Sequence, residues 1–162
     1  MKKLTILSFL FFSLTSLAQI GPYKDALEKI TNSAEYQTHT KNRKKYHVFN
    51  EMVAFSKMGI MFQEELEKYN IKVSYGEVSE KDKNKRKRRV NLLSLNQKKQ
   101  SKLKIFFTEE KQNIFFAELF EANDDNIKYD YRQPSTDSYM FMFEKLEDNT
   151  VKLIEVKLIP NH

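Results

Sequence analysis

The hydrophobic pattern divides the chain into a first part with helical spacing and a second part with strand spacing. Between Arg43 and Tyr69, apolar residues recur at intervals of three and four, which is the spacing of one face of an α-helix. The segment contains no proline and a single glycine, Gly59. Its apolar face covers roughly half of the helix circumference, which is wide for a surface helix. We therefore predict one long helix over 43–69, lying in the concavity of a curved sheet, with Asn70 as its C-cap.

The segments on either side of this helix follow two different patterns. Pro22 suits the first turn of a helix, and the residues after it predict a short helix over 22–33. From Ile71 onward, apolar and polar residues alternate as they do in strands with one buried face. The segment 114–121 is apolar on both faces and is expected at the centre of the sheet. The predicted strands are 71–75, 90–95, 102–107, 114–121, 127–131, 139–146 and 150–159, with hairpin loops at 109–113 and 147–149.

Helices followed by a run of strands predict an α+β fold, in which the helices cover one face of an antiparallel sheet of six to seven strands. In the last strand, Ile154, Val156 and Leu158 are expected to share the buried face. This order of elements resembles the cystatin-like roll, whose commonest members are similar to nuclear transport factor. The resemblance lies in element order and covers most of the chain after residue 18. It implies a concave sheet but no single function, because such folds include enzymes, ligand binders and interaction modules.

The first 18 residues have the features of a secretory signal peptide. Lys2 and Lys3 precede an apolar stretch over 4–17, and Ser16-Leu17-Ala18 has the small residues of a cleavage site. The apolar stretch is shorter than the roughly 20 residues that a membrane span needs. We predict cleavage before Gln19, a single domain over 19–162, and a periplasmic or extracellular location.

The absence of cysteine excludes several kinds of chemistry, and the distribution of charge singles out one basic segment. The chain has no Cys, which excludes disulfides, thiol catalysis and Cys-ligated metals. The formal net charge is +6, but the segment 81–104 alone holds eleven basic residues and one acid. The sequence therefore describes a mildly acidic body with one strongly basic segment.

The basic segment is the first candidate for binding. Its cations are densest in the run Lys83, Lys85, Arg86, Lys87, Arg88 and Arg89. Export removes chromosomal nucleic acid from the list of partners, and no aromatic residue in the run is available for base stacking. The remaining partners are anionic glycans, lipid head groups, extracellular DNA or an acidic protein. The alternative is a solvated loop that joins two strands and has no partner.

Four tyrosines are the second candidate, for a small-molecule pocket in the concave face of the sheet. Aromatic rings with a few polar tips are typical of such pockets. The residues are Tyr75, Tyr129, Tyr131 and Tyr139. The alternative is ordinary packing against the long helix, and we expect Phe49, Phe55 and Phe62 to fill the space in that case.

No residue set predicts catalysis, a metal site or a cofactor. His39 and His47 are eight residues apart, and no third ligand follows at metal spacing. Glu64, Glu65 and Glu67 have no partner that the sequence places opposite them. Two hypotheses therefore remain: an exported, non-enzymatic binding protein that contacts anionic surfaces, and a small-molecule binder or minor enzyme that uses the tyrosine pocket.

Overall fold

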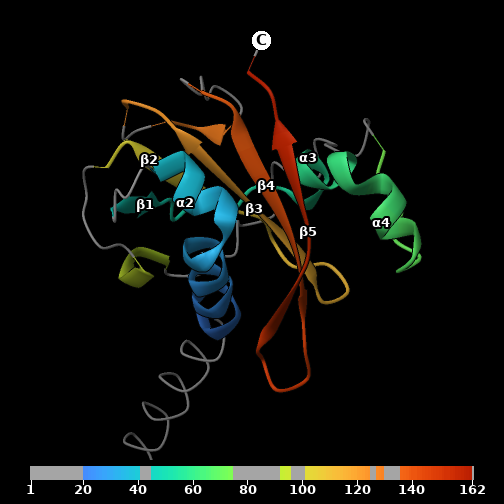
Figure 1. Ribbon diagram of the computed structural model, residues 1–162. Helices are drawn as coiled ribbons and strands as arrows, with labels where there is room; N and C mark the ends of the chain where they lie inside the picture. Colours follow the sequence, from blue (N-terminus) through green and yellow to red (C-terminus); the bar gives the residue numbers. More distant parts are fainter. Residues whose placement is uncertain are drawn as a thin grey trace, which may run out of the picture.

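The structure is a computed structural model that describes residues 20–40, 45–74, 92–95, 101–124, 127–129 and 136–161 (Figure 1). It is an α+β fold, as predicted. Its described strands form one mixed sheet in the order β1-β2-β3-β4-β5. The strands are β1 (Tyr46–Val48), β2 (Leu103–Phe107), β3 (Ile114–Glu121), β4 (Ser138–Lys145) and β5 (Val151–Ile159). β1 runs parallel to β2, and the remaining neighbours are antiparallel.

The sheet from β2 to β5 confirms the predicted strands over 102–107, 114–121, 139–146 and 150–159. β3 lies at the centre, and nearly all of its residues are buried. Its run is apolar on both sides because both faces of the sheet are covered. The β2–β3 hairpin turns at Gln112 and Asn113, which both have positive φ. Two consecutive residues with positive φ are the mark of a type I′ hairpin turn. Asn149, also at positive φ, lies in the β4–β5 turn.

The first face of the sheet is covered by the amino-terminal helical segments. Residues 20–32 are helical, and α2 (Ala34–Thr40) follows after a bend at Ser33. Their buried side chains pack on residues of β1 to β5 in one apolar cluster, which we call the first cluster. The predicted short helix over 22–33 is thus present. The members contributed by the helical segments are Tyr23, Ala26, Leu27, Ile30 and Tyr36.

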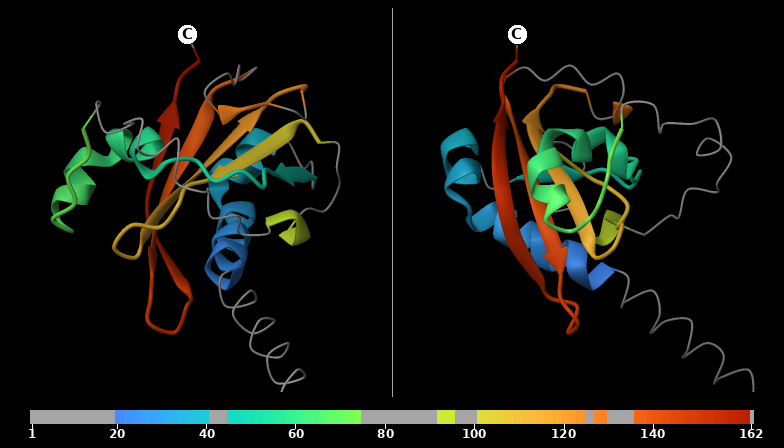
Figure 2. Two further views of the ribbon diagram at one scale, coloured as in Figure 1. Left: turned by 180° about the vertical axis from the view of Figure 1, so that it is seen from behind. Right: turned by 90° about the vertical axis from the view of Figure 1, so that its right-hand side faces the viewer.

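The second face is covered by three short helical segments. These are α3 (Phe55–Gly59), the 3₁₀ turn η1 (Ile60–Phe62) and α4 (Gln63–Glu67). Met58, Phe62 and Leu66 are completely buried in a second apolar cluster with side chains of β2, β3 and β4. The right-hand view of Figure 2 shows α2 and α4 on opposite sides of β5. The prediction that helices cover one face is therefore wrong, since helical segments cover both.

The predicted long helix over 43–69 is also wrong. Tyr46–Val48 is a strand at the sheet edge, and regular helix begins only at Phe55. Tyr46 and Val48 pack in the first cluster, whereas Phe49 and Val53 pack in the second. The apolar face looked wide because its residues serve opposite faces of the sheet. The helix was predicted to run to Tyr69 with Asn70 as its C-cap; α4 ends at Glu67 with Lys68 as its C-cap, and Asn70 takes the left-handed conformation of the turn that follows.

The C-terminus of α4 is a Schellman motif at Asn70. Asn70 has a φ of 55°, which Asn tolerates better than most residues. Its N–H donates to the Glu67 carbonyl at 3.0 Å, and the Ile71 N–H donates to the Leu66 carbonyl at 3.1 Å. Leu66 and Ile71 are both buried in the second cluster, as this motif favours.

Fewer strands are present among the described residues than the six to seven predicted. Residues 71–74 have no regular structure, and Leu92–Leu95 is the 3₁₀ turn η2. Residues 127–129 are not in a strand, and residues 75, 90, 91, 130 and 131 lie outside the described part of the chain. Ile71 and Val73 alternate because their side chains pack in the second cluster. Alternation reports side-chain burial and does not by itself require a paired backbone.

A β-bulge changes which residues of β5 face inward. Leu153 pairs with Phe143 and Glu155 pairs with Met142, so Ile154 is an extra residue in the ladder. Leu153 packs on the first cluster, Ile154 on the second and Val156 again on the first. The prediction that Ile154, Val156 and Leu158 share a buried face is therefore wrong, and Leu158 is 52% exposed.

Candidate functional site

Two oppositely charged side chains lie buried on the second face of the sheet. Lys104 in β2 and Glu118 in β3 are both 0% exposed, and they are the only buried charged residues in the described part of the chain. Ser138, also buried, donates a hydrogen bond of 2.8 Å from its hydroxyl to Glu118 Oε1. Buried charge is costly unless it is compensated, so this group is the first place to look for chemistry.

The register of the sheet aligns these residues in a polar row. His47 is the register partner of Lys104 across β1 and β2. Lys104 pairs with Phe120, and Phe106 pairs with Glu118, so Lys104 and Glu118 are diagonal neighbours. Diagonal neighbours are within reach of long side chains. Four adjacent strands thus contribute His47, Lys104, Glu118 and Ser138, which we call the polar row.

Aromatic rings surround the polar row. The Phe106 ring stacks on Phe49 with centroids 4.0 Å apart and on Phe120 with centroids 5.8 Å apart. Tyr129 meets Phe106 edge to face at 5.3 Å. These rings exclude water, which strengthens every electrostatic contact inside and raises the cost of any lost partner. A serine hydroxyl on a carboxylate is also the beginning of a nucleophile–base pair, but a substrate has no access to side chains that are completely buried. The polar row therefore has a structural role in this conformation.

The four tyrosines proposed for a pocket do not gather in one place. Tyr129 is buried in the second cluster, whereas Tyr139 packs against the first, on the opposite face of the sheet. Tyr75 and Tyr131 lie outside the described residues. Phe49 and Phe62 are buried in the second cluster and Phe55 packs against it, with the Phe55 and Phe62 rings both against Phe116. This is the filled arrangement that the sequence offered as the alternative to a pocket.

The basic run lies outside the described residues, but its flanks are described. Val73 precedes it and packs on the second cluster. Leu92 follows it and is buried in the first cluster. The Leu92 N–H donates a 2.8 Å hydrogen bond to Asn50 Oδ1. The described residues on either side of the basic run, Val73 and Leu92, therefore pack on opposite faces of the sheet. The described parts of the two predicted flanking strands, 71–74 and 92–95, are not strands, and residues 75–91 lie outside the described part of the chain.

One carboxylate of the acidic helix end is paired. Glu65 Oε2 accepts a hydrogen bond of 3.0 Å from Lys157 Nζ, which also donates to the Met61 carbonyl at 2.9 Å. Burial raises the pKa of Glu65, but the hydrogen bond and the charge of Lys157 outweigh it and hold the pKa below its ordinary value. Lys157 also lies over the Phe62 ring, 5.0 Å from its centroid. This group joins β5 to the helical cover of the second face.

The other titratable candidates have no common site. His47 is in β1 with its ring 4.7 Å from that of Phe49, His39 belongs to α2, and His162 is outside the described residues. Within the described ranges, no group of three or more His, Asp or Glu residues is placed to hold a metal ion.

Sequence reasoning missed the polar row, although one signal was present. Glu118 is a charged residue inside a run that is apolar on both faces, and such a residue must be buried with compensation. Lys104 gave no comparable signal, because a lysine that alternates with apolar residues is typical of the solvent face of a strand.

In comparisons with known proteins, no family model, no curated protein and no solved structure matches the chain. Among the residues that the structure describes, none of the helices is both long enough and apolar enough to cross a membrane.

Proposed function

We propose that this protein is an exported, non-enzymatic binding protein that contacts anionic surfaces through the basic run 81–89. The observation that carries the proposal is charge density, since nine consecutive residues hold seven cations and one acid, Asp82. Unpaired cations are very costly to bury, so these side chains need solvent or an anionic partner. Outside the segment 81–104, the chain after residue 18 has a net charge of only about −6, spread over many residues, which is too dispersed to neutralise them.

The described flanks support this role. Residues on both sides of the segment are packed in the core, so the cations stay attached to the folded body at two points. Each cation close to an anionic membrane contributes about 1 kcal/mol, and the attraction falls off over a Debye length of about 8 Å at physiological salt. Several cations acting together therefore give binding that is strong at low salt and weak at high salt.

The second hypothesis, a tyrosine pocket, receives no such support. Its two described tyrosines lie on opposite faces of the sheet, and phenylalanine rings occupy the face that was to be hollow. The proposed function is therefore binding to anionic surfaces alone.

A charge-matched pair of variants tests the proposal. The test variant replaces Lys85, Arg86, Lys87, Arg88 and Arg89 by serine. The control variant replaces five exposed lysines outside the segment 81–104 by serine and so has the same net charge; these are Lys24, Lys68, Lys72, Lys128 and Lys152. Retention on immobilised heparin and on vesicles containing anionic lipid is measured across a salt series.

The expected result is that the test variant loses salt-sensitive retention while the control keeps most of it. Surface substitutions usually change stability by less than about 0.5 kcal/mol each, so both variants should still fold and melt cooperatively. Heparin and vesicles distinguish a glycan from a lipid partner. Equal retention of the test variant and the wild-type protein on both supports would contradict the proposal.

A further inference from the structure

β5 forms one edge of the described sheet, and it is nine residues long. It runs along the outer side of the sheet in the right-hand view of Figure 2, with helical segments to either side of it. The side of an edge strand that faces away from the sheet presents backbone N–H and C=O groups in the geometry that another strand requires. The outer side of β5 is therefore a candidate interaction surface.

The position of Val151 shows which backbone groups point outward. Its N–H donates to Asp25 Oδ2 of the first helix, so it points away from β4. Backbone groups alternate along an antiparallel strand, and the extra residue Ile154 advances that alternation by one. The N–H and C=O groups of Leu153, Val156 and Leu158 consequently point outward as well.

The side chains of these residues follow the same alternation. Leu153 and Val156 pack against the first cluster, and Leu158 is paired with Tyr139 on that same face. Leu158 is half-exposed, which leaves apolar surface beside the edge. Glu155 and Lys157 lie on the opposite face, paired with Met142 and Met140.

The edge is complementary to itself when a two-fold axis passes through Val156. In an antiparallel pair of β5 strands, Val156 then faces its own copy. Glu155 of each strand faces Lys157 of the other, so the pairing contains two Glu–Lys ion pairs that the two-fold axis relates. With the bulge residue Ile154 left out of the ladder, Leu158 faces Leu153, and both have outward backbone groups. In this register, paired side chains lie on the same face of the sheet, opposite charges face each other, and the backbone groups of Leu153, Val156 and Leu158 point toward the second strand.

We propose that β5 pairs with β5 of a second copy of this chain, antiparallel and centred on Val156, so that two sheets become one continuous sheet. A two-fold interface must be self-complementary, and the arrangement of Glu155, Val156 and Lys157 meets that condition. The Lys157 ammonium has three N–H donors. The Met61 carbonyl and Glu65 use two of them, and the third is available for Glu155 of the second copy.

The register is tested by crosslinking. Because the chain has no cysteine, Val156→Cys introduces a single thiol. Directly opposed, hydrogen-bonded residues have Cα atoms about 5.5 Å apart, which suits a disulfide. Mild oxidation should therefore produce a covalent dimer of the Val156→Cys variant. Lys152→Cys on the same strand is the control, since in this register it lies more than about 20 Å from its counterpart and should give no covalent dimer.

A charge complementation experiment tests the ion pairs. Glu155→Lys places two lysines opposite each other in the homodimer, and Lys157→Glu places two glutamates there. Each variant alone should have a dimer dissociation constant raised by about tenfold or more, and an equimolar mixture should recover dimerisation as a heterodimer. Glu147→Lys in the exposed β4–β5 turn is the control and should dimerise like the wild-type protein.

Sedimentation velocity across a concentration series reports all of these states. A wild-type protein that stays monomeric up to about 0.1 mM would overturn the proposal. A dimer that dissociates more readily than this is too weak to be a specific interface. A dimer that is indifferent to both charge reversals, or equal crosslinking through positions 152 and 156, would also overturn the proposal. A melt of Lys157→Glu shows whether the loss of its bond to Glu65 has unfolded the variant. Glu155→Lys leaves that bond in place and decides the question on its own.

Discussion

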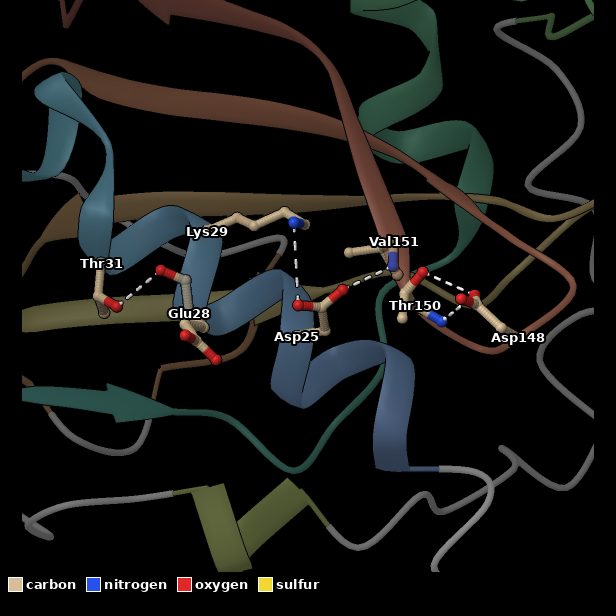
Figure 3. Close-up of polar contacts among 7 residues, drawn as sticks. All are labelled: Asp25, Glu28, Lys29, Thr31, Asp148, Thr150 and Val151. Carbon is tan, nitrogen blue, oxygen red and sulfur yellow. Dashed lines mark hydrogen bonds and ion pairs between the residues drawn. The ribbon is translucent and has the colours of Figure 1, made fainter.

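Asp25 and Val151 are 126 positions apart in the chain, yet Asp25 Oδ2 accepts a hydrogen bond of 2.6 Å from the Val151 N–H (Figure 3). The first helix thereby holds the start of the edge strand β5. Asp25 Oδ1 also lies 3.9 Å from Lys29 Nζ one helical turn further on. The carboxylate accepts a hydrogen bond from a backbone N–H that would otherwise have no partner at the sheet edge.

Replacement of Asp25 by alanine should destabilise the protein. The partly buried Val151 N–H would lose a charged acceptor, which typically costs about 1.5–3 kcal/mol in the free energy of unfolding. Asp25→Asn keeps an oxygen acceptor and should cost less. Glu28→Ala, on an exposed position of the same helix, is the control and should stay within about 0.5 kcal/mol. Urea denaturation of the three variants measures the differences, and an Asp25→Ala variant as stable as the control would refute this role.

The buried charges of the polar row should be energetically coupled. Lys104→Met or Glu118→Leu alone leaves the opposite charge buried with less compensation, which typically costs about 3–5 kcal/mol. The double variant removes both charges and should lose less than the sum of the single variants, with a coupling energy of at least about 1 kcal/mol. A double-mutant cycle from chemical denaturation gives this value. Strict additivity would mean that each charge is compensated by other groups.

The contact between Glu65 and Lys157 should make stability depend on pH. Because the folded-state pKa of Glu65 lies below its ordinary value of 4.5, the contact stabilises the protein above that pH. The stabilisation is lost as the pH falls through the lower, folded-state pKa. Glu65→Gln should therefore cost about 1 kcal/mol at pH 7 and progressively less in acid. Denaturation at a series of pH values compares the two proteins, and a gap that stays constant down to pH 2 would speak against the contact.

Gly59 is a point of close approach between α3 and the sheet. A Cβ atom at this position would lie 3.3 Å from the rings of Phe116 and Phe55 and from a methyl group of Val73. Gly59→Val should therefore overpack the second cluster and cost about 1–3 kcal/mol. Gly21→Val is a matched control, because a Cβ at Gly21 meets no atom within 4 Å. Thermal melts of both variants give the comparison, and equal stability of the two would show that the neighbouring rings yield easily.

Local patterns in the chain are sufficient to predict the parts of this fold that depend on neighbouring residues. The hairpin strands of β2 to β5 follow from local alternation interrupted by turn residues, and Gln112, Asn113 and Asn149 adopt the positive φ that such turns require. The central place of β3 follows from a run that is apolar on both sides. The left-handed turn at Asn70 after α4 follows from the tolerance of Asn for this backbone conformation. Each of these features is encoded within a few residues of chain.

Other features depend on partners that are distant in the chain, and they arise only when the segments pack together. Tyr46–Val48 becomes a strand because Leu103–Ile105 lies alongside it, and no pattern within 43–69 contains that information. The bulge at Ile154 reverses the faces of β5, since a single extra residue shifts a two-residue period. The register of β2 and β3 brings Lys104 next to Glu118, and it turns an ordinary strand lysine into a buried charge. Local periodicity reports which side chains avoid water, whereas pairing and register depend on contacts between segments far apart in the chain.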